Sequence, residues 1–249
     1  MFNELKLNRI IMIMVSLVIA WSLKYHYSRS SSDDLVWILA PTAYLVEMTG
    51  DMTFEREINT GYVNNESTII IAPSCSGINF MIIAFCLSAY VGLKKIKTMP
   101  AQVMWIISSI GGSYFYTLFV NTFRINLSIY SIKIEFLETW FSRETVHLCE
   151  GVLVYFIFLL IYYYLLNRFI NPELTKFSKK SFMGVNRYFL PLFFYLAFTL
   201  LIPVLNNGGF PPSQDFTRFA SIVLISCSVV FILFFLLKAC CHYVAVRVK

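Results

Sequence analysis

Long apolar runs separated by short polar segments dominate the hydrophobic pattern of the chain. Six of them approach the roughly 20 residues that a helix needs to cross the hydrocarbon core of a bilayer. These runs are 10–23, 77–93, 102–120, 146–166, 188–205 and 219–237. None shows the alternation, about ten residues long, of a membrane β-barrel strand. The pattern predicts an all-α polytopic membrane protein with about six full transmembrane helices.

A further apolar segment, 35–48, is short and is interrupted by Pro41. A segment of about 12 to 14 residues fits a re-entrant or interfacial helix better than a full crossing. If it crossed, the chain would have seven spans and its N-terminus would lie outside. The polar and acidic segment 49–74 follows, and we interpret it as a loop whose last part, 67–74, is extended.

Composition supports the membrane class and narrows the function. The 249 residues are 58% hydrophobic and 14% charged, whereas soluble domains carry about 25% charged residues. The net charge of +6 does not indicate nucleic-acid binding, because the basic residues lie in short loops between apolar runs. Six cysteines without CxxC spacing argue against a zinc site or a disulfide framework. We expect no metal and no cofactor.

The distribution of Lys and Arg predicts the orientation of the chain. Segments 94–97, 168–187 and 238–249 hold eleven of these residues, and the opposite segments 49–74, 120–150 and 206–218 hold five. The positive-inside rule places the first set in the cytoplasm. The run 10–23 lacks a small-residue cleavage site, so we interpret it as a retained helix.

With this orientation, Cys75, Arg124 and His147 all lie at the extracytoplasmic ends of their helices. Cys75 directly precedes a helix start, where free N–H groups and the helix dipole stabilise an anion such as a thiolate. Arg124 offers a fixed guanidinium for a developing oxyanion, and His147 a general acid or base. Taken singly, each has a plain alternative: a buried thiol, an arginine reaching head groups, an interfacial histidine.

Five neighbouring residues are candidates for substrate binding or for orienting the trio. Small residues after the cysteine let the backbone approach a substrate carbonyl, and a carboxylate on the face of the histidine, one turn away, orients the ring. The candidates are Ser76, Gly77, Asn79, Asn121 and Glu150.

Three segments carry a family resemblance: PSCSGINF with Cys75, VNTFRINLS with Arg124 and ETVHLCEG with His147. Their order and spacing resemble the exosortase/archaeosortase family, and WILAPTAYLVEMTG before them is most like the exosortase K branch. The resemblance covers about 35–170. It departs from typical members in a shorter front and in two further spans after the region that carries the motif.

The resemblance implies a membrane-embedded cysteine protease or transpeptidase acting on the extracytoplasmic side of the cell membrane. Its substrate would be a secreted protein with a C-terminal sorting signal, and its acceptor an unidentified group such as a lipid or a polysaccharide. Cys75 would be the nucleophile, His147 the general acid/base and Arg124 the stabiliser of the tetrahedral intermediate. The alternatives are a purely hydrolytic protease, and a transporter or scaffold for envelope polysaccharide.

The chain divides into three parts on this interpretation. Residues 1–34 form an N-terminal transmembrane helix and a polar linker. Residues 35–170 form the catalytic membrane core. Residues 171–249 add two transmembrane helices, a basic cytoplasmic loop and a tail.

Overall fold

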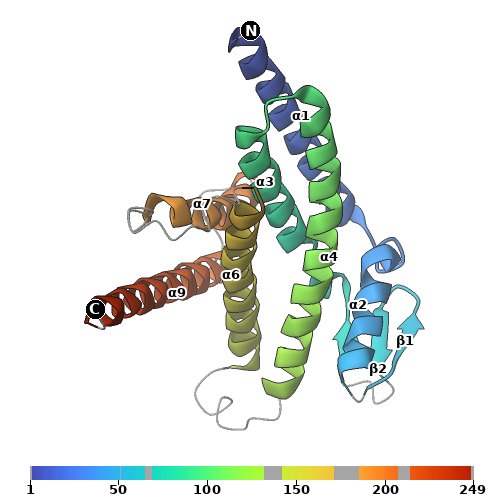
Figure 1. Cartoon of the computed structure of the whole chain (residues 1–249). Coiled ribbons are helices and arrows are strands. Elements are labelled where there is room, and N and C mark those ends of the chain that lie inside the picture. Colours follow the sequence, from blue (N-terminus) through green and yellow to red (C-terminus); the bar gives the residue numbers. More distant parts are fainter. Residues whose placement is uncertain are drawn as a thin grey trace.

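The computed structural model describes residues 2–50, 52–64, 69–131, 142–170, 185–206 and 214–247. The described chain is almost entirely helical, with one small antiparallel sheet beside the helices (Figure 1). This confirms the predicted helical class. The basic loop expected at 168–187 lies largely outside the described residues.

Five of the described helices are long and apolar enough to cross a membrane. They are α1 (Phe2–Arg29), α3 (Ile78–Lys95), α4 (Met99–Ser131), α6 (Arg143–Ile170) and α9 (Gln214–Arg247). Each covers one of the predicted apolar runs, α3 all but the first residue of its run, and each extends beyond it at one end or both. The continuation of α4 matters most for the site, because Arg124 lies within this helix and not in a following loop.

The predicted span 188–205 is built from three consecutive helical segments. These are α7 (Val185–Leu196), the π-helical η4 (Ala197–Leu201) and α8 (Ile202–Asn206). Its apolar stretch, Phe189–Val204, is shorter than the five long spans. Pro191 lies inside α7, and Pro203 follows η4 closely. Proline removes helix hydrogen bonds, which accounts for the departure from regular α-helical geometry.

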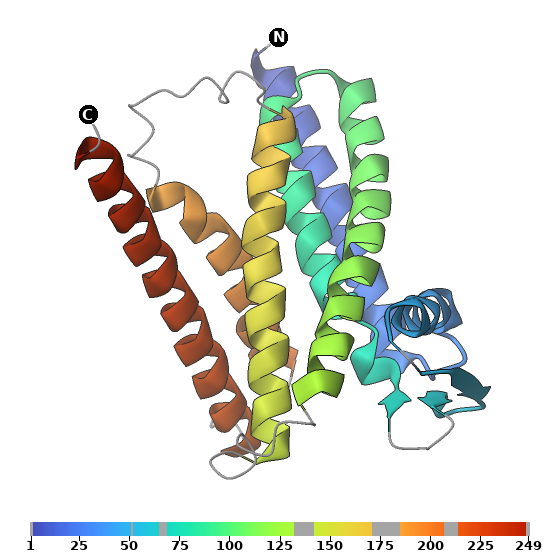
Figure 2. The same ribbon diagram turned by 60° about the horizontal axis from the view of Figure 1, so that its bottom comes forward.

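The short segment predicted at 35–48 is the helix α2 (Val36–Thr49). Figure 2 shows it end-on while the long helices run up the page, so it crosses them steeply. Pro41 cannot donate to the carbonyl of Trp37, four residues earlier. Tyr114 of α4 donates its hydroxyl to that carbonyl instead, at 2.8 Å. The proline thus leaves the carbonyl of Trp37 free to accept from Tyr114, and this hydrogen bond joins α2 to α4.

The segment interpreted as a polar loop contains a three-stranded sheet, which the sequence analysis missed. Strands β1 (Phe54–Glu57), β2 (Gly61–Asn64) and β3 (Ile70–Ile71) pair antiparallel in that order. The turn between β1 and β2 contains Asn59, whose φ is 63°, and asparagine tolerates this left-handed conformation. The extended part expected at 67–74 agrees with the described strand β3.

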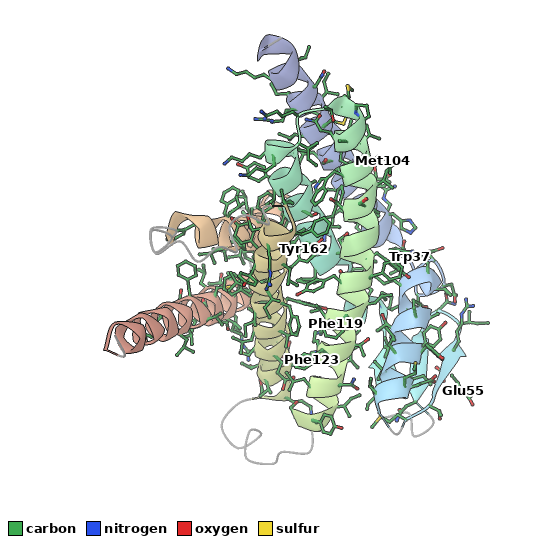
Figure 3. All side chains as sticks on the ribbon, viewed as in Figure 1. Trp37, Glu55, Met104, Phe119, Phe123 and Tyr162 are labelled. Carbon is green, nitrogen blue, oxygen red and sulfur yellow. The ribbon has the colours of Figure 1, made fainter. Side chains whose placement is uncertain are left out.

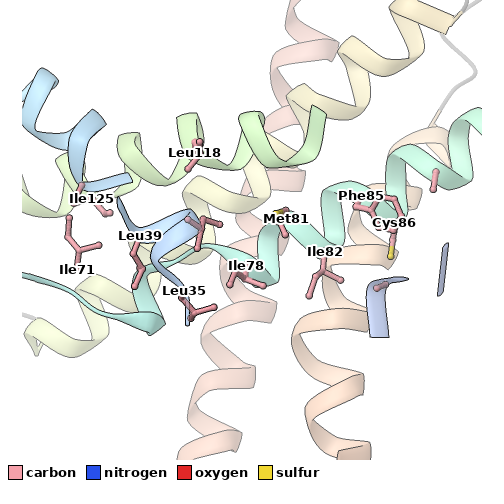
Figure 4. Packing of buried hydrophobic residues seen from close by; sticks show 14 of the residues in the cluster. Leu35, Leu39, Ile71, Ile78, Met81, Ile82, Phe85, Cys86, Leu118 and Ile125 are labelled. Carbon is pink, nitrogen blue, oxygen red and sulfur yellow. The ribbon is translucent and has the colours of Figure 1, made fainter. Parts of the chain in front are cut away.

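The helix α3 is the centre of the packing. The apolar window of this span is 89% buried, compared with 17% to 44% for the other four spans. One side packs against α1, α2, β3 and α4 in a single apolar cluster (Figure 4). The other side packs against α4, α6 and α7, and α9 joins the same apolar cluster by packing on α6. A helix that is apolar all round is one that other helices enclose.

The outer faces of the bundle are apolar as well. On α4, Met104 is 62% exposed and Phe119 is 59% exposed (Figure 3). Tyr162 of α6 is buried and stacks on Tyr116, with 4.6 Å between the ring centroids. Large exposed apolar surfaces are unfavourable in water, so this arrangement suits helices whose outer faces contact lipid.

Figure 2 shows both chain termini near the end of the bundle where α3 turns into α4. That turn carries the predicted cytoplasmic residues Lys94, Lys95 and Lys97. The sheet and the ends of α4 and α6 that carry Arg124 and His147 lie at the opposite end. The fold therefore separates this basic turn from the three candidate residues.

Candidate functional site

A pocket of about 440 Å³ lies at the sheet end of the bundle. Its wall is formed by β3, by the 3₁₀ turn η1 (Pro73–Cys75) and by facing ends of α4 and α6. Cys75, Arg124 and His147 all line this pocket. Three residues separated by as many as 72 positions in the sequence therefore border one space.

Cys75 is held in a rigid turn just before α3. Pro73 opens the turn, and the backbone N–H of Cys75 donates to the carbonyl of Ala72 at 2.8 Å. Gly77 then begins α3 with a φ of 73°. A Cβ on Gly77 would lie 3.1 Å from Thr117 and 3.2 Å from the amide carbon of Asn121. We expected the small glycine to let the backbone approach a substrate. In the structure it lets the backbone approach α4.

Asn121 fixes the backbone of the cysteine. Its side chain is fully buried, and its Nδ2 donates to the carbonyl of Cys75 at 2.5 Å. Its Oδ1 accepts from the hydroxyl of Tyr155 at 2.9 Å. Both ends of the amide are thus engaged by protein, so Asn121 orients the cysteine and does not line the pocket.

Arg124 is buried, with 8% of its surface exposed, and its guanidinium bridges α4 and α6. Nη1 donates to the hydroxyl of Tyr155 at 3.2 Å, and Nη2 contacts His147 Nε2 at 3.0 Å. Gly151 makes room for this bridge, because a Cβ there would lie 3.3 Å from Nε of the arginine. The guanidinium also interacts electrostatically with Cys75 and Glu150.

The partners of His147 define its tautomer. A guanidinium has no acceptor, so Nε2 must accept from Arg124 and carry no proton. The other nitrogen, Nδ1, then carries the proton and donates to the Ser128 hydroxyl oxygen at 2.8 Å. In a protonated ring, the Nε2–H would face an N–H of Arg124, and two positive charges would lie side by side. The ring is therefore neutral, with its basic lone pair on the nitrogen nearest the guanidinium.

The remaining predicted residues have separate places. Ser76 is buried and its Oγ accepts from the N–H of Ile78 at 3.5 Å. Asn79 lies outside the pocket, where its Oδ1 accepts from Lys24 at 2.7 Å. Glu150 lines the pocket, but both ring nitrogens of His147 bond to side chains of α4. The prediction that Glu150 orients the ring of His147 is therefore wrong, because Ser128 and Arg124 hold its two nitrogens.

Two residues of the site were missed in the sequence. Tyr155 lies two turns after His147 on α6 and joins Asn121 to Arg124. Ser128 lies one turn after Arg124 on α4, at the spacing that places two side chains on the same helix face. That spacing was the available signal for Ser128. The tyrosine had none, since fifteen tyrosines occur in the chain.

The thiol of Cys75 has no hydrogen-bond partner among the described residues, and Arg124 is the group that interacts with both Cys75 and His147. Cys86 and Cys227 are buried in apolar clusters away from the pocket. Within the described ranges, no group of three or more His, Cys, Asp or Glu is placed to hold a metal ion.

Comparison of the chain with protein-family models, with curated proteins and with solved structures gives no significant match. The class that fold and site define is a helical membrane protein with a Cys, Arg and His pocket at one end of its bundle. Any narrower assignment depends on the residues and their geometry.

Proposed function

We propose that this chain is an exosortase-like cysteine protease or transpeptidase of the cell membrane. It would cleave secreted proteins near a C-terminal sorting signal and pass the acyl group to an acceptor. One observation carries the proposal: Cys75, Arg124 and His147 share a pocket of about 440 Å³. A transporter or scaffold requires no nucleophile, general base and cation converging on one cavity.

The neutral form of His147 suits the first step. Its unprotonated Nε2 takes the thiol proton, and the sulfur of Cys75 attacks the carbonyl carbon of the substrate peptide bond. Nε2 is occupied by Arg124 in the resting site. The guanidinium must therefore move from the ring toward the oxygen that becomes negative, where its charge stabilises the tetrahedral intermediate.

The later steps release the leaving group and then restore the enzyme. The imidazolium gives its proton to the leaving amine, the C–N bond breaks, and a thioester to Cys75 remains. An acceptor hydroxyl or amine, or water, then attacks the thioester carbonyl. His147 takes the acceptor proton and returns it to the departing sulfur. Transfer and hydrolysis differ only in this attacking group.

The placement in the membrane follows from the same proposal. The span Phe189–Val204 would be the sixth crossing, and α2 would lie in the interface on the extracytoplasmic side. Both termini and the turn at Lys94–Lys97 would then face the cytoplasm. The pocket would open at the depth of the lipid head groups, where a membrane-anchored substrate presents the residues next to its anchor.

The decisive experiment compares the host's secreted and membrane proteins in strains carrying wild-type chain, Cys75→Ala or Cys149→Ala. Cys149 is a half-buried thiol on α6 that does not line the pocket, so it is a matched control. We expect Cys75→Ala alone to abolish a C-terminal processing event, seen by mass spectrometry as retention of the uncleaved C-terminal peptide.

The new C-terminus of the processed protein distinguishes transfer from hydrolysis. An added mass identifies an acceptor, and a free carboxylate identifies water as the attacking group. If Cys75→Ala leaves every C-terminus unchanged while Arg124→Ala alters the cell envelope, the protease proposal is wrong and the transporter or scaffold alternative is favoured.

A further inference from the structure

The strand β3 forms one wall of the pocket in an unusual way. Three consecutive residues, Ile69, Ile70 and Ile71, all border it. Side chains alternate between the two faces of a strand, so three consecutive residues border one space only when that space runs along the backbone edge. The sheet order β1-β2-β3 places β3 at an edge, with β2 on its other side.

The register shows which backbone groups face the pocket. The N–H of Asn64 donates to the carbonyl of Ile69 at 3.1 Å, and Val63 pairs with Ile70. Hydrogen-bonded and non-bonded pairs alternate in antiparallel sheets. Ile70 therefore occupies a non-bonded pair, and its N–H and C=O point away from β2. Among the described residues nothing bonds to these two groups, and Ile70 is 47% exposed.

We propose that an extended peptide binds in this pocket as a fourth strand, pairing with Ile70 of β3. The inference rests on the proposed function, because it names how the substrate of that site is held. The chain of β3 continues through Ala72 into η1. A peptide aligned with β3 therefore runs toward Cys75.

The opposite wall of the pocket supports a peptide occupant. Ile125, Ile129 and Val146 form an apolar surface against which alternate side chains of the added strand pack. Main-chain bonds give affinity in this mode of recognition, and the side-chain wall gives specificity. A backbone entering a site near the membrane also needs partners for its polar groups, and Ile70 supplies one donor and one acceptor. A lipid hydrocarbon chain has no hydrogen-bonding groups that could pair with them.

The test uses an acetylated six-residue alanine peptide with a chloromethyl ketone at its C-terminus. Alkylation of Cys75 forms an S–C bond and releases chloride and the thiol proton. The rate is measured by intact-mass spectrometry on the full-length protein in detergent. A second reagent carries the same ketone, with every peptide nitrogen methylated so that no amide donates. We expect it to react roughly tenfold more slowly with the wild-type chain, because strand pairing is lost.

Two variants locate the effect. Ile70→Pro removes the outward N–H without touching the bonds to β2, and proline is tolerated at a sheet edge. Ile70→Ala shortens the side chain to the same degree or more and keeps the N–H. The lost N–H would bond to a peptide carbonyl, which both reagents keep, so we expect the unmethylated reagent to react roughly fivefold more slowly with Ile70→Pro than with Ile70→Ala. The rate difference between the two reagents reports on donation to the Ile70 carbonyl and should persist in Ile70→Ala. Should Ile70→Pro unfold, the methylation effect in the wild-type chain decides alone.

Equal rates of the two reagents with wild-type chain overturn strand addition, as do equal rates of the unmethylated reagent with Ile70→Pro and with Ile70→Ala. Either result leaves the proposed function standing if Cys75→Ala still abolishes processing. Conversely, a clear methylation effect together with normal processing by Cys75→Ala overturns the proposed function and leaves a peptide-binding edge. Failure of both reagents to alkylate Cys75 in folded protein overturns both.

Discussion

A single side chain, that of Tyr155 on α6, connects α3, α4 and α6 around the cysteine. It donates to Asn121, which holds the Cys75 carbonyl, and it accepts from Arg124. The ring of Tyr155 also stacks on Phe80 of α3, with centroids 5.0 Å apart. Backbone position, cation position and helix packing at the site therefore depend on one side chain.

Tyr155→Phe should keep the stacking and lose both hydrogen bonds. We expect a loss of about 1–3 kcal/mol in the free energy of unfolding, because two buried polar groups each lose a partner. Processing should fall as well, since the guanidinium is freed on one side. Unfolding of the purified protein by titration with a denaturing detergent measures the first effect.

Tyr116→Phe is the control for this change. The hydroxyl of Tyr116 donates to the carbonyl of Phe158 at 2.7 Å, and that carbonyl also lies within α6. Its removal should cost about 1 kcal/mol or less and leave processing intact. Equal losses in the two variants would contradict the special position assigned to Tyr155.

At the scale of single residues, the sequence predicted which three residues lie together better than it predicted the contacts that hold them. Cys75, Arg124 and His147 were recognisable because each is an unusual polar residue at the end of an apolar run. Their links were not, because Asn121 and Tyr155 meet only when α4 and α6 pack together. The tautomer of His147 also depends on that packing.

At the scale of elements, the long helices were predictable because their apolar runs exceed the length of any core strand. The sheet was not. Its strands contain four, four and two residues, and β1 is mostly charged, so no alternation was visible. Tertiary contacts hold it: Glu47 of α2 accepts from the N–H of Phe54 at 2.6 Å.

A second tie joins the sheet to the linker before α2. Asp33 accepts from Arg56 at 2.7 Å and from the N–H of Asn59 at 3.2 Å. The hydrogen bond from Arg56 lowers the pKa of Asp33 below its ordinary value. A lowered pKa in the folded state means that the contact stabilises the hairpin above about pH 3.9, the value in an unfolded chain. This contribution is lost as the pH falls through the folded pKa.

We therefore expect the amides of 54–64 to exchange faster, relative to their intrinsic rates, when the pH is lowered from about 5 to about 2.5. Hydrogen exchange followed by mass spectrometry measures this. Asp33→Asn should exchange faster at both pH values and show little further change. A pH response that survives in Asp33→Asn would assign it to another carboxylate.

At the scale of the whole molecule, the separation of basic loops from the pocket defines an orientation that can be tested. Ile58, in the hairpin turn, is 78% exposed, and Lys97 is exposed in the turn between α3 and α4. We introduce Ile58→Cys or Lys97→Cys into a Cys75→Ala background. A membrane-impermeant maleimide should label only the first in intact cells and both after lysis, because the positive-inside rule places Lys97 in the cytoplasm.

The parent chain with Cys75→Ala alone gives the background labelling. Labelling of Lys97→Cys in intact cells, with Ile58→Cys protected, would invert the orientation and place the pocket in the cytoplasm. Such a result would remove secreted proteins as substrates.

The enclosure of α3 has a consequence for biogenesis. This helix leaves the ribosome before α4, α6 and α7, yet its final neighbours include all three. During synthesis it must first rest against lipid or the insertion machinery, and it becomes enclosed only when the later helices arrive. The contacts between Cys75, Asn121 and Tyr155 therefore form only after α6 has been made, so the nascent chain carries Cys75 before its pocket exists.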